Sequence, residues 1–173
     1  MKDVMLTLIG PDRTGIVARM AAVVEKNGGN WLDCRMIRMG GYFSGILRIA
    51  LPEDSVSAFG GEVYRFMKEV GYQYSIQATE LDGGSSEGLL AHLELSGQDH
   101  PGIVHAIFEV FRKNGVNVEE LKTGLKAAPW SGTPVFEAKA RVRVPEGVSG
   151  ERLRENLESL ATDLLVEVDF KEN

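Results

Sequence analysis

Leu6 to Trp31 reads LTLIGPDRTGIVARMAAVVEKNGGNW, and Leu93 to Val118 reads LELSGQDHPGIVHAIFEVFRKNGVNV. The two segments align without a gap at an offset of 87 residues, and 12 of the 26 aligned positions are identical. The identical letters form the pattern G-x-D-x-x-G-I-V, followed by an apolar-periodic stretch and K-N-G-x-N. A repeat of this length indicates two copies of one small domain rather than a solenoid of short repeats.

The composition is typical of a soluble protein with packed cores. The 173 residues are 43% hydrophobic and 25% charged, and length alone permits one domain or two small ones. The net charge of −6 argues against duplex nucleic acid as the main ligand. Cys34 is the only cysteine, which excludes an intrachain disulfide and suits a reducing compartment. The start of the chain lacks a long apolar segment, so we expect a cytoplasmic protein that does not enter a membrane.

The first copy predicts the element order βαββαβ. Apolar residues from Gly15 onward have one-sided helical spacing, and Asn27-Gly28-Gly29 ends that helix. The residues on this core side are Ile16, Val17, Met20, Val23 and Val24. Gly40-Gly41 separates two apolar runs by two residues, which is typical of a β-hairpin. The pair Gly60-Gly61 weakens the second helix, so its first turns are expected to be irregular. We expect strands over residues 4–9, 30–38, 42–51 and 72–80, and helices over 15–26 and 52–70.

The second copy repeats this order after the polar segment LDGGSSEG, which is typical of a linker. The residues expected on the core side of its first helix are Ile103, Val104, Ile107, Val110 and Phe111. Ser149 is expected to cap its second helix. The predicted domains are residues 1–80 and 89–173, joined by the linker 81–88. The fold class is therefore α+β, with two ferredoxin-like βαββαβ units, each an antiparallel sheet with helices on one face. We expect strands over residues 89–95, 116–126, 135–144 and 165–170, and helices over 101–113 and 149–164.

The shared D-x-x-G-I-V motif lies where a strand turns into a helix. The first N–H groups of a helix have no partner within it, and a glycine there removes the side chain that would block a ligand. A carboxylate or phosphate can therefore bind at such a helix start. Pro101 suits the first helical position, where its missing N–H costs nothing. Asp12 and Asp99 are expected to cap or brace the turn. The structural alternative is that the glycines serve only close packing and the aspartates only capping.

An asparagine begins the strand after the first helix in each copy. Asn30 and Asn117 begin the next strand, and we expect them near the same end of the sheet as the D-x-x-G-I-V loop. A side-chain amide there could meet an α-amino or carboxylate group of a ligand. It could equally stabilise the turn.

The paired segments GPDRTGIVARMAAVVEKNGGN and GQDHPGIVHAIFEVFRKNGVN resemble those of tandem ACT-domain proteins, most of all the glycine cleavage system transcriptional repressor group. The resemblance covers nearly the whole chain and implies domains that pair side by side or face to face. It also implies small ligands, often amino acids, at the junctions between domains. The residues that match the ligand-lining positions of the family are Asp12, Arg13, Thr14, Gly15, Ile16, Asn30, Asp99, His100, Pro101, Gly102, Ile103 and Asn117.

Catalysis is the first competing interpretation. The three histidines are His92, His100 and His105, and the last two are five residues apart, which does not match the i, i+4 spacing of a helical metal pair. Cys34 is predicted within a strand, and the sequence gives no evidence of a base that would activate it. The two repeats and the short linker leave no residues for a catalytic domain. We therefore predict no enzyme activity, no cofactor and no metal site.

Nucleic-acid binding is the second competing interpretation. An RNA-recognition domain shares the βαββαβ order and reads RNA with aromatic residues on its sheet. Tyr42 and Phe43 weakly match that pattern, but the second copy lacks it, and we expect one surface and one core residue. No helix-turn-helix pattern accompanies the arginines of the first half. Any role in transcription is expected to use a protein partner.

Apolar residues on both sides of the first sheet bear on assembly. Ile46 and Ala50 fall opposite Phe43 and Leu47, which fits burial against another domain or subunit and favours a homodimer. Trp130 is a candidate partner contact or a lid over its own domain. We therefore predict a regulatory protein that binds an amino acid or similar carboxylate and regulates a partner, with glycine metabolism suggested by the resemblance. The alternative is a protein–protein interaction module without a ligand site.

Overall fold

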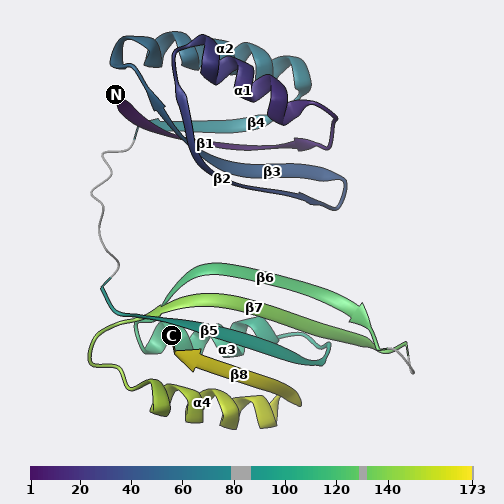
Figure 1. Cartoon of the computed structure of the whole chain (residues 1–173). Coiled ribbons are helices and arrows are strands. Elements are labelled where there is room, and N and C mark those ends of the chain that lie inside the picture. Colours follow the sequence, from purple (N-terminus) through teal and green to yellow (C-terminus); the bar gives the residue numbers. More distant parts are fainter. Residues whose placement is uncertain (79–86, 129–131, 173) are drawn as a thin grey trace. The chain divides into compact units, whose positions relative to one another are not determined.

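The computed structural model describes residues 1–78, 87–128 and 132–172. The chain divides into two compact units, Met1–Gly83 and Gly84–Asn173 (Figure 1). Most of the expected linker 81–88 lies outside the described residues, as does Trp130, so the exact domain limits and the role of Trp130 stay predictions. Within the described ranges, no helix has the length and apolar character needed to span a membrane.

Unit 1 is one antiparallel sheet with two helices on one face, as predicted (Figure 1). The strand order is β2-β3-β1-β4. A single 3₁₀ turn, η1, precedes the second helix, which then runs without interruption through both of its glycines. The expected irregularity is thus confined to the turn before that helix. The elements are β1 (Lys2–Pro11), α1 (Ile16–Lys26), β2 (Asn30–Met39), β3 (Tyr42–Leu51), η1 (Glu53–Ser55), α2 (Val56–Val70) and β4 (Gln73–Ala78).

Unit 2 repeats the same plan with the strand order β6-β7-β5-β8. Ser149 caps its second helix by accepting a hydrogen bond from the backbone N–H of Arg152, as expected. The two βαββαβ units confirm the α+β, tandem ferredoxin-like fold class. The elements are β5 (Leu89–Gln98), α3 (Ile103–Lys113), β6 (Asn117–Ala127), β7 (Pro134–Val144), α4 (Gly150–Asp163) and β8 (Val166–Glu172).

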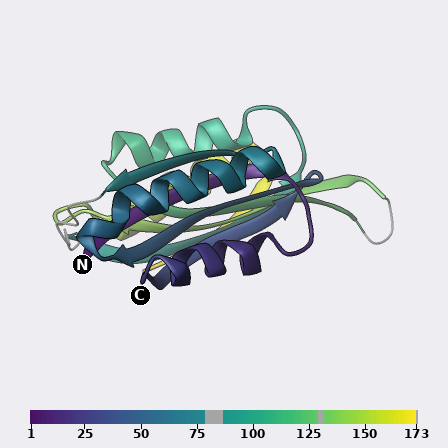
Figure 2. The ribbon, with the colours of Figure 1, turned by 90° about the horizontal axis from the view of Figure 1, so that it is seen from above.

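The core of each unit lies between its sheet and its helix pair. In unit 1 the helices α1 and α2 lie side by side over the sheet (Figure 2). Alternate residues of β1, namely Val4, Leu6 and Leu8, are buried against them, because successive side chains of a strand point to opposite faces. Phe43 packs against this core while Tyr42 is 55% exposed, as the sequence predicts.

Irregularities in the strands shape the sheet faces. Gly40 and Gly41 have φ of +57° and +82°, which the two-residue hairpin turn between β2 and β3 requires. A bulge between Trp31 and Asp33 adds one residue to β2. As a result, Trp31 packs against the core while Ile37 lies on the face of the sheet that the helices do not cover.

Candidate functional site

Both predicted binding loops end in an open helix start. Gly15 and Gly102 occupy the N-cap positions of α1 and α3 with φ of +88° and +98°, a left-handed conformation that side chains rarely adopt. Neither helix start has a side-chain cap. A Cβ added at either glycine would have no heavy atom within 4 Å. Each glycine is therefore required by backbone conformation, and the space beside it is open where a side chain would begin.

Two details of the predicted helix start need correction. The helix α3 begins at Ile103, so Pro101 lies before the N-cap and not at the first helical position. The turn instead needs a left-handed residue directly before the helix, and Gly102 supplies it. Asp12 and Asp99 do not cap the helices with their side chains. Asp12 braces its loop in another way.

The first loop is held from two sides. The carboxylate of Asp12 accepts a hydrogen bond from Arg38 Nε, and its backbone N–H donates to the Gly41 carbonyl at 2.9 Å, which ties the loop to the β2–β3 hairpin. The hydroxyl of Tyr72 donates to the Pro11 carbonyl at 2.8 Å, which ties the loop to the end of α2. Burial and the nearby Asp12 carboxylate raise the pKa of Tyr72, so its hydroxyl keeps its proton.

The second loop is held by different chemistry. Leu125 takes the position of Arg38, so Asp99 has no matching arginine on β6, and its backbone N–H donates to the Pro134 carbonyl at 3.2 Å. The ring of His100 lies between two carbonyl oxygens: Nε2 is 2.8 Å from Leu164 O and Nδ1 is 3.0 Å from Pro101 O.

Two acceptors facing the two ring nitrogens fit the doubly protonated imidazolium, in which both nitrogens carry a proton. The hydrogen bond to Leu164, then that to Pro101, and finally the Asp99 charge raise the pKa of His100, against an opposing effect of burial. His100 therefore joins the second loop to the end of α4 through contacts that favour its charged form. Sequence reasoning gave it only as a ligand-lining residue, because its partner Leu164 is 64 residues away.

The other glycine of the motif has a packing role. A Cβ on Gly10 would lie 2.1 Å from the Tyr72 ring, and one on Gly97 would lie 2.6 Å from the Val166 side chain. No real Cβ approaches other atoms so closely, so Gly10 is needed to make room for Tyr72, directly before β4, and Gly97 for Val166 in β8. The structural interpretation of the motif thus holds for these two positions.

The K-N-G part of the repeat is also structural. Asn27 Nδ2 donates to the Val23 carbonyl at 2.8 Å, and Asn114 Nδ2 donates to the Val110 carbonyl at the same distance. Each amide adds a hydrogen bond to a carbonyl in the last turn of its helix, where intrahelical N–H donors run out. This leaves the loops before α1 and α3 as the shared feature that packing does not explain.

The structure contradicts the expected position of Asn30 and Asn117. In unit 1, Asn30 pairs with Ala50, which pairs with Asp3 at the start of β1, whereas the loop follows Pro11 at the other end. The helix α1 carries the chain back along the sheet, so the next strand begins where β1 began. Asn117 is likewise level with Leu90 and not with Gln98. Each asparagine therefore lies at the opposite end of its sheet from its own loop.

The motif valines are more exposed than their helical spacing suggests. Val17 is 45% exposed and Val104 is 40% exposed, although both were expected on the core side. Ile16 and Ile103, one residue earlier, are buried and offer only backbone groups. In both copies, therefore, an exposed valine directly follows the open helix start and belongs to the surface around the loop.

The structure brings the remaining predicted residues together within each loop. Arg13 and Thr14 are exposed beside Gly15, and Asp99 and Pro101 are exposed beside Gly102. His100 is half-buried by its contact with α4. Across residues 1–78, 87–128 and 132–172, no three His, Cys, Asp or Glu side chains are grouped so that they could hold a metal ion.

Known proteins share both the sequence of the first unit and the fold of the whole chain. Residues 2–77 match the model of the ACT domain family. A UPF0237 protein of Methanocaldococcus jannaschii is 30% identical over 83 residues, which are 47% of this chain and 92% of the relative. The crystal structure of an unknown protein from Galdieria sulphuraria has a TM-score of 0.83 and 26% identity, and the match covers 99% of this chain and 98% of that one.

A second solved structure shares the two-unit fold at lower sequence identity. It is that of a candidate glycine cleavage system transcriptional repressor, with a TM-score of 0.71 and 18% identity over 99% of this chain and 98% of that one. At this identity the likeness concerns the fold.

Proposed function

Because the chain belongs to the ACT domain family, we propose that it is a non-catalytic, cytoplasmic regulatory protein that binds a small carboxylate ligand at junctions between ACT domains. An amino acid is the ligand class that fits best. The protein would regulate a partner protein, and transcription in amino-acid metabolism, including that of glycine, is one route. The pair of open helix starts carries this proposal.

Each open helix start has the groups that bind a carboxylate. The backbone N–H groups of Gly15 and Ile16, and of Gly102 and Ile103, lie at the positive ends of α1 and α3, equivalent to roughly half an elementary charge. Arg13 stands two residues before Gly15, and His100, whose pKa is raised by its two carbonyl contacts, stands two residues before Gly102. Each loop therefore has groups that favour an anion, beside the carboxylate of Asp12 or Asp99.

Each asparagine is too far from its own loop to share a site with it. Along β5, Leu90 and Gln98 are eight residues apart, or about 26 Å at roughly 3.3 Å per residue, far longer than an amino acid. If Asn117 contributes to a site, that site must therefore lack the loop of its own unit. The exposed Val17 and Val104 beside the loops fit coverage by a neighbouring ACT domain.

Signal transmission requires that the ligand bind one state of association better than another. A ligand held at a junction between ACT domains meets this condition, since it contacts both domains only when they are joined. The two loops are braced differently, by Asp12 and Tyr72 in one and by His100 in the other. We therefore expect the two sites to differ in affinity.

The competing function is a protein–protein interaction module whose loops hold no ligand. The observation in its favour is that Gly10, Gly97, Asn27 and Asn114 are explained by packing and hydrogen bonding alone. The two functions differ in whether any small carboxylate stabilises the protein.

A thermal-shift screen against the twenty amino acids and common metabolic carboxylates tests the proposal. A ligand at 100 times its dissociation constant should add about 2.7 kcal/mol of stability, which is a shift of several degrees. Gly15→Ala and Gly102→Ala place a methyl group in the open space of each loop and should each remove the shift at that loop. Gly147→Ala is the matched control, because Gly147 also has positive φ and open space, near the other end of its sheet.

The outcomes are distinct. A shift lost in one loop variant and kept in the control assigns the site to that loop. A shift that persists when both loop glycines are replaced contradicts the proposed site. The absence of any shift favours the interaction module.

A further inference from the structure

The helix-free face of the first sheet has a large block without charged side chains. Five apolar residues on it are exposed: Ile9 by 45%, Ile37 by 50%, Met39 by 67%, Tyr42 by 55% and Ile46 by 42%. Paired residues of neighbouring strands share a face, and the register makes the block continuous across the sheet. We call this block the uncharged face; its members are Thr7, Ile9, Ile37, Met39, Tyr42, Ser44, Ile46, Gln73 and Ser75.

The second unit provides an internal comparison, because it has the same fold and strand register. Thr7 pairs with Ile46 on the first sheet, and the equivalent pair on the second sheet is Glu94 with Lys139, joined by an ion pair of 2.7 Å. The equivalent of Met39 is Lys126, which forms an ion pair of 2.6 Å with a glutamate of β7. The charged residues at positions equivalent to the uncharged face are Glu94, Lys126, Glu137, Lys139, Glu167 and Asp169.

The second sheet shows how this fold presents the same face to water, with six charges at these positions. The first sheet has uncharged residues at all six equivalent positions. Scattered apolar residues on a surface need no explanation, but a continuous block that is charged in the duplicate is typical of a surface that is covered.

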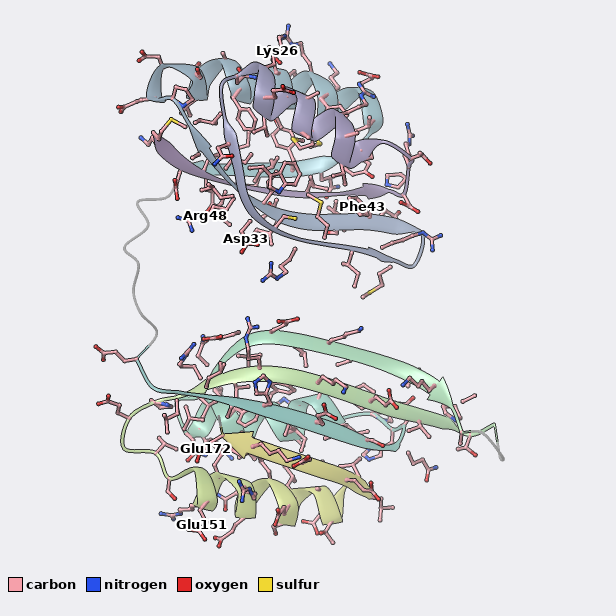
Figure 3. All side chains as sticks on the ribbon, viewed as in Figure 1. Lys26, Asp33, Phe43, Arg48, Glu151 and Glu172 are labelled. Atoms are coloured by element: carbon pink, nitrogen blue, oxygen red, sulfur yellow. The ribbon has the colours of Figure 1, made fainter. Side chains whose placement is uncertain are left out.

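The charges that border the uncharged face are neutralised within their own unit. Arg35 Nη1 lies 2.8 Å from an Asp33 carboxylate oxygen, and Arg48 Nε lies 2.8 Å from Asp3. Figure 3 shows Asp33 and Arg48 on the side of the sheet away from α1 and α2. A partner with a strong charge of either sign would therefore gain nothing here. A second copy of the same face would instead place only uncharged side chains against the uncharged side chains of the first.

The size of the whole helix-free side of the sheet also suits a pair of identical copies. Four strands at about 4.8 Å spacing and up to ten residues in length measure roughly 19 by 30 Å, or about 600 Å² in projection, and the uncharged face is the half of this side next to the β2–β3 hairpin. The side-chain relief increases the accessible area. This is within reach of the roughly 800 Å² per partner that a stable interface buries.

We propose that the uncharged face packs against the same face of a second copy of this chain, about a twofold axis. Such an interface is self-complementary, since the same residues contribute from both sides. The inference deepens the proposed function, on which its regulatory meaning rests, by naming the surface through which copies associate. The association itself needs no ligand.

The double variant Thr7→Glu/Ile46→Lys tests the proposal. It installs the ion pair that the second sheet carries at the same register, so the fold is known to accept it. In a twofold interface each introduced charge would be present, and buried, in both copies. The dimer dissociation constant, measured by sedimentation velocity without added ligand, should rise by about 100-fold or more.

Two further variants complete the design. Ile37→Lys lies on the same face near the edge of the sheet and should weaken the dimer as well. Tyr64→Lys is the matched control, because Tyr64 is 52% exposed but lies on α2, in the helix layer. The control should dimerise like the wild type, and circular dichroism of each sample verifies that its fold is intact.

A wild-type chain that stays monomeric at high micromolar concentration overturns the proposal, because the face is then either free or covered within one chain. A folded double variant that dimerises as tightly as the wild type also overturns it, since the interface must then lie elsewhere. The ligand screen on the monomeric double variant tests the proposed function separately.

Discussion

Replacing the glycines of the repeated motif by alanine is expected to lower the stability of the fold by different amounts and for different reasons. A Cβ on Gly97 would lie 2.7 Å from the Cα of Val166, so β8 must move by at least 0.7 Å to reach the 3.4 Å of ordinary contact. A backbone atom in a paired strand cannot turn aside as a side chain can. Gly97→Ala should therefore cost about 3 kcal/mol, the upper end for overpacking.

Gly102→Ala meets no such obstacle. Its Cβ has no heavy atom within 4 Å, and the cost is the strain of holding alanine at a φ of +98°, about 1 kcal/mol. For a domain of this size, 1 kcal/mol corresponds to a melting shift of about 4–8 °C. We expect a loss within that range for Gly102→Ala and about three times as much for Gly97→Ala.

The assay is thermal unfolding without ligand, combined with hydrogen exchange of the β5 segment, which reports on unit 2 separately from unit 1. Both alanine substitutions lie in unit 2, five residues apart, so differences in stability between the two units do not affect the comparison. Equal losses, or a larger loss for Gly102→Ala, would refute the division of the motif into a packing glycine and an open loop glycine.

Three further predictions concern the contacts that hold the loops and helix ends. The raised pKa of His100 means that its protonation stabilises the fold: the effect is complete below a pH of about 6.5 and is lost as pH rises through the folded pKa. His100→Gln should remove this dependence, measured as melting temperature between pH 5.5 and 8.5; an unchanged profile would contradict the tether. Tyr72→Phe removes one hydrogen bond to Pro11 and should cost about 1 kcal/mol in urea unfolding. Asn114→Ala should cost about the same by losing its bond to the last turn of α3, whereas a neutral effect would exclude this role.

Much of the fold follows from local sequence signals. The apolar period of α1, the Gly40-Gly41 turn and the Ser149 cap each act over a few residues, and the structure confirms all three. The duplication then extends the argument from one unit to the other. Strand ends were less accurate, as with β5, which continues three residues beyond the expected end to Gln98.

The features that were missed depend on contacts between distant residues. Gly10 must be glycine because of its contact with the ring of Tyr72, 62 positions later, and no residue near Gly10 in the sequence indicates that contact. Helical periodicity identified the apolar side of α1 but not how far the sheet covers it, so Val17 was placed in the core. The error for Asn30 was different, because the element order alone implies that a helix returns the chain to the start of the first strand.

The central claim is that the open helix starts bind a small carboxylate. The most direct measurement is a titration of isotopically labelled protein with glycine and the other amino acids, following the backbone amide signals by NMR. The account predicts that a binding amino acid shifts the amides of Gly15 and Ile16, of Gly102 and Ile103, or of both pairs, before other signals of the same unit. Saturable binding that shifts amides elsewhere and leaves both loops unchanged would contradict it, as would the absence of binding by any amino acid or metabolic carboxylate.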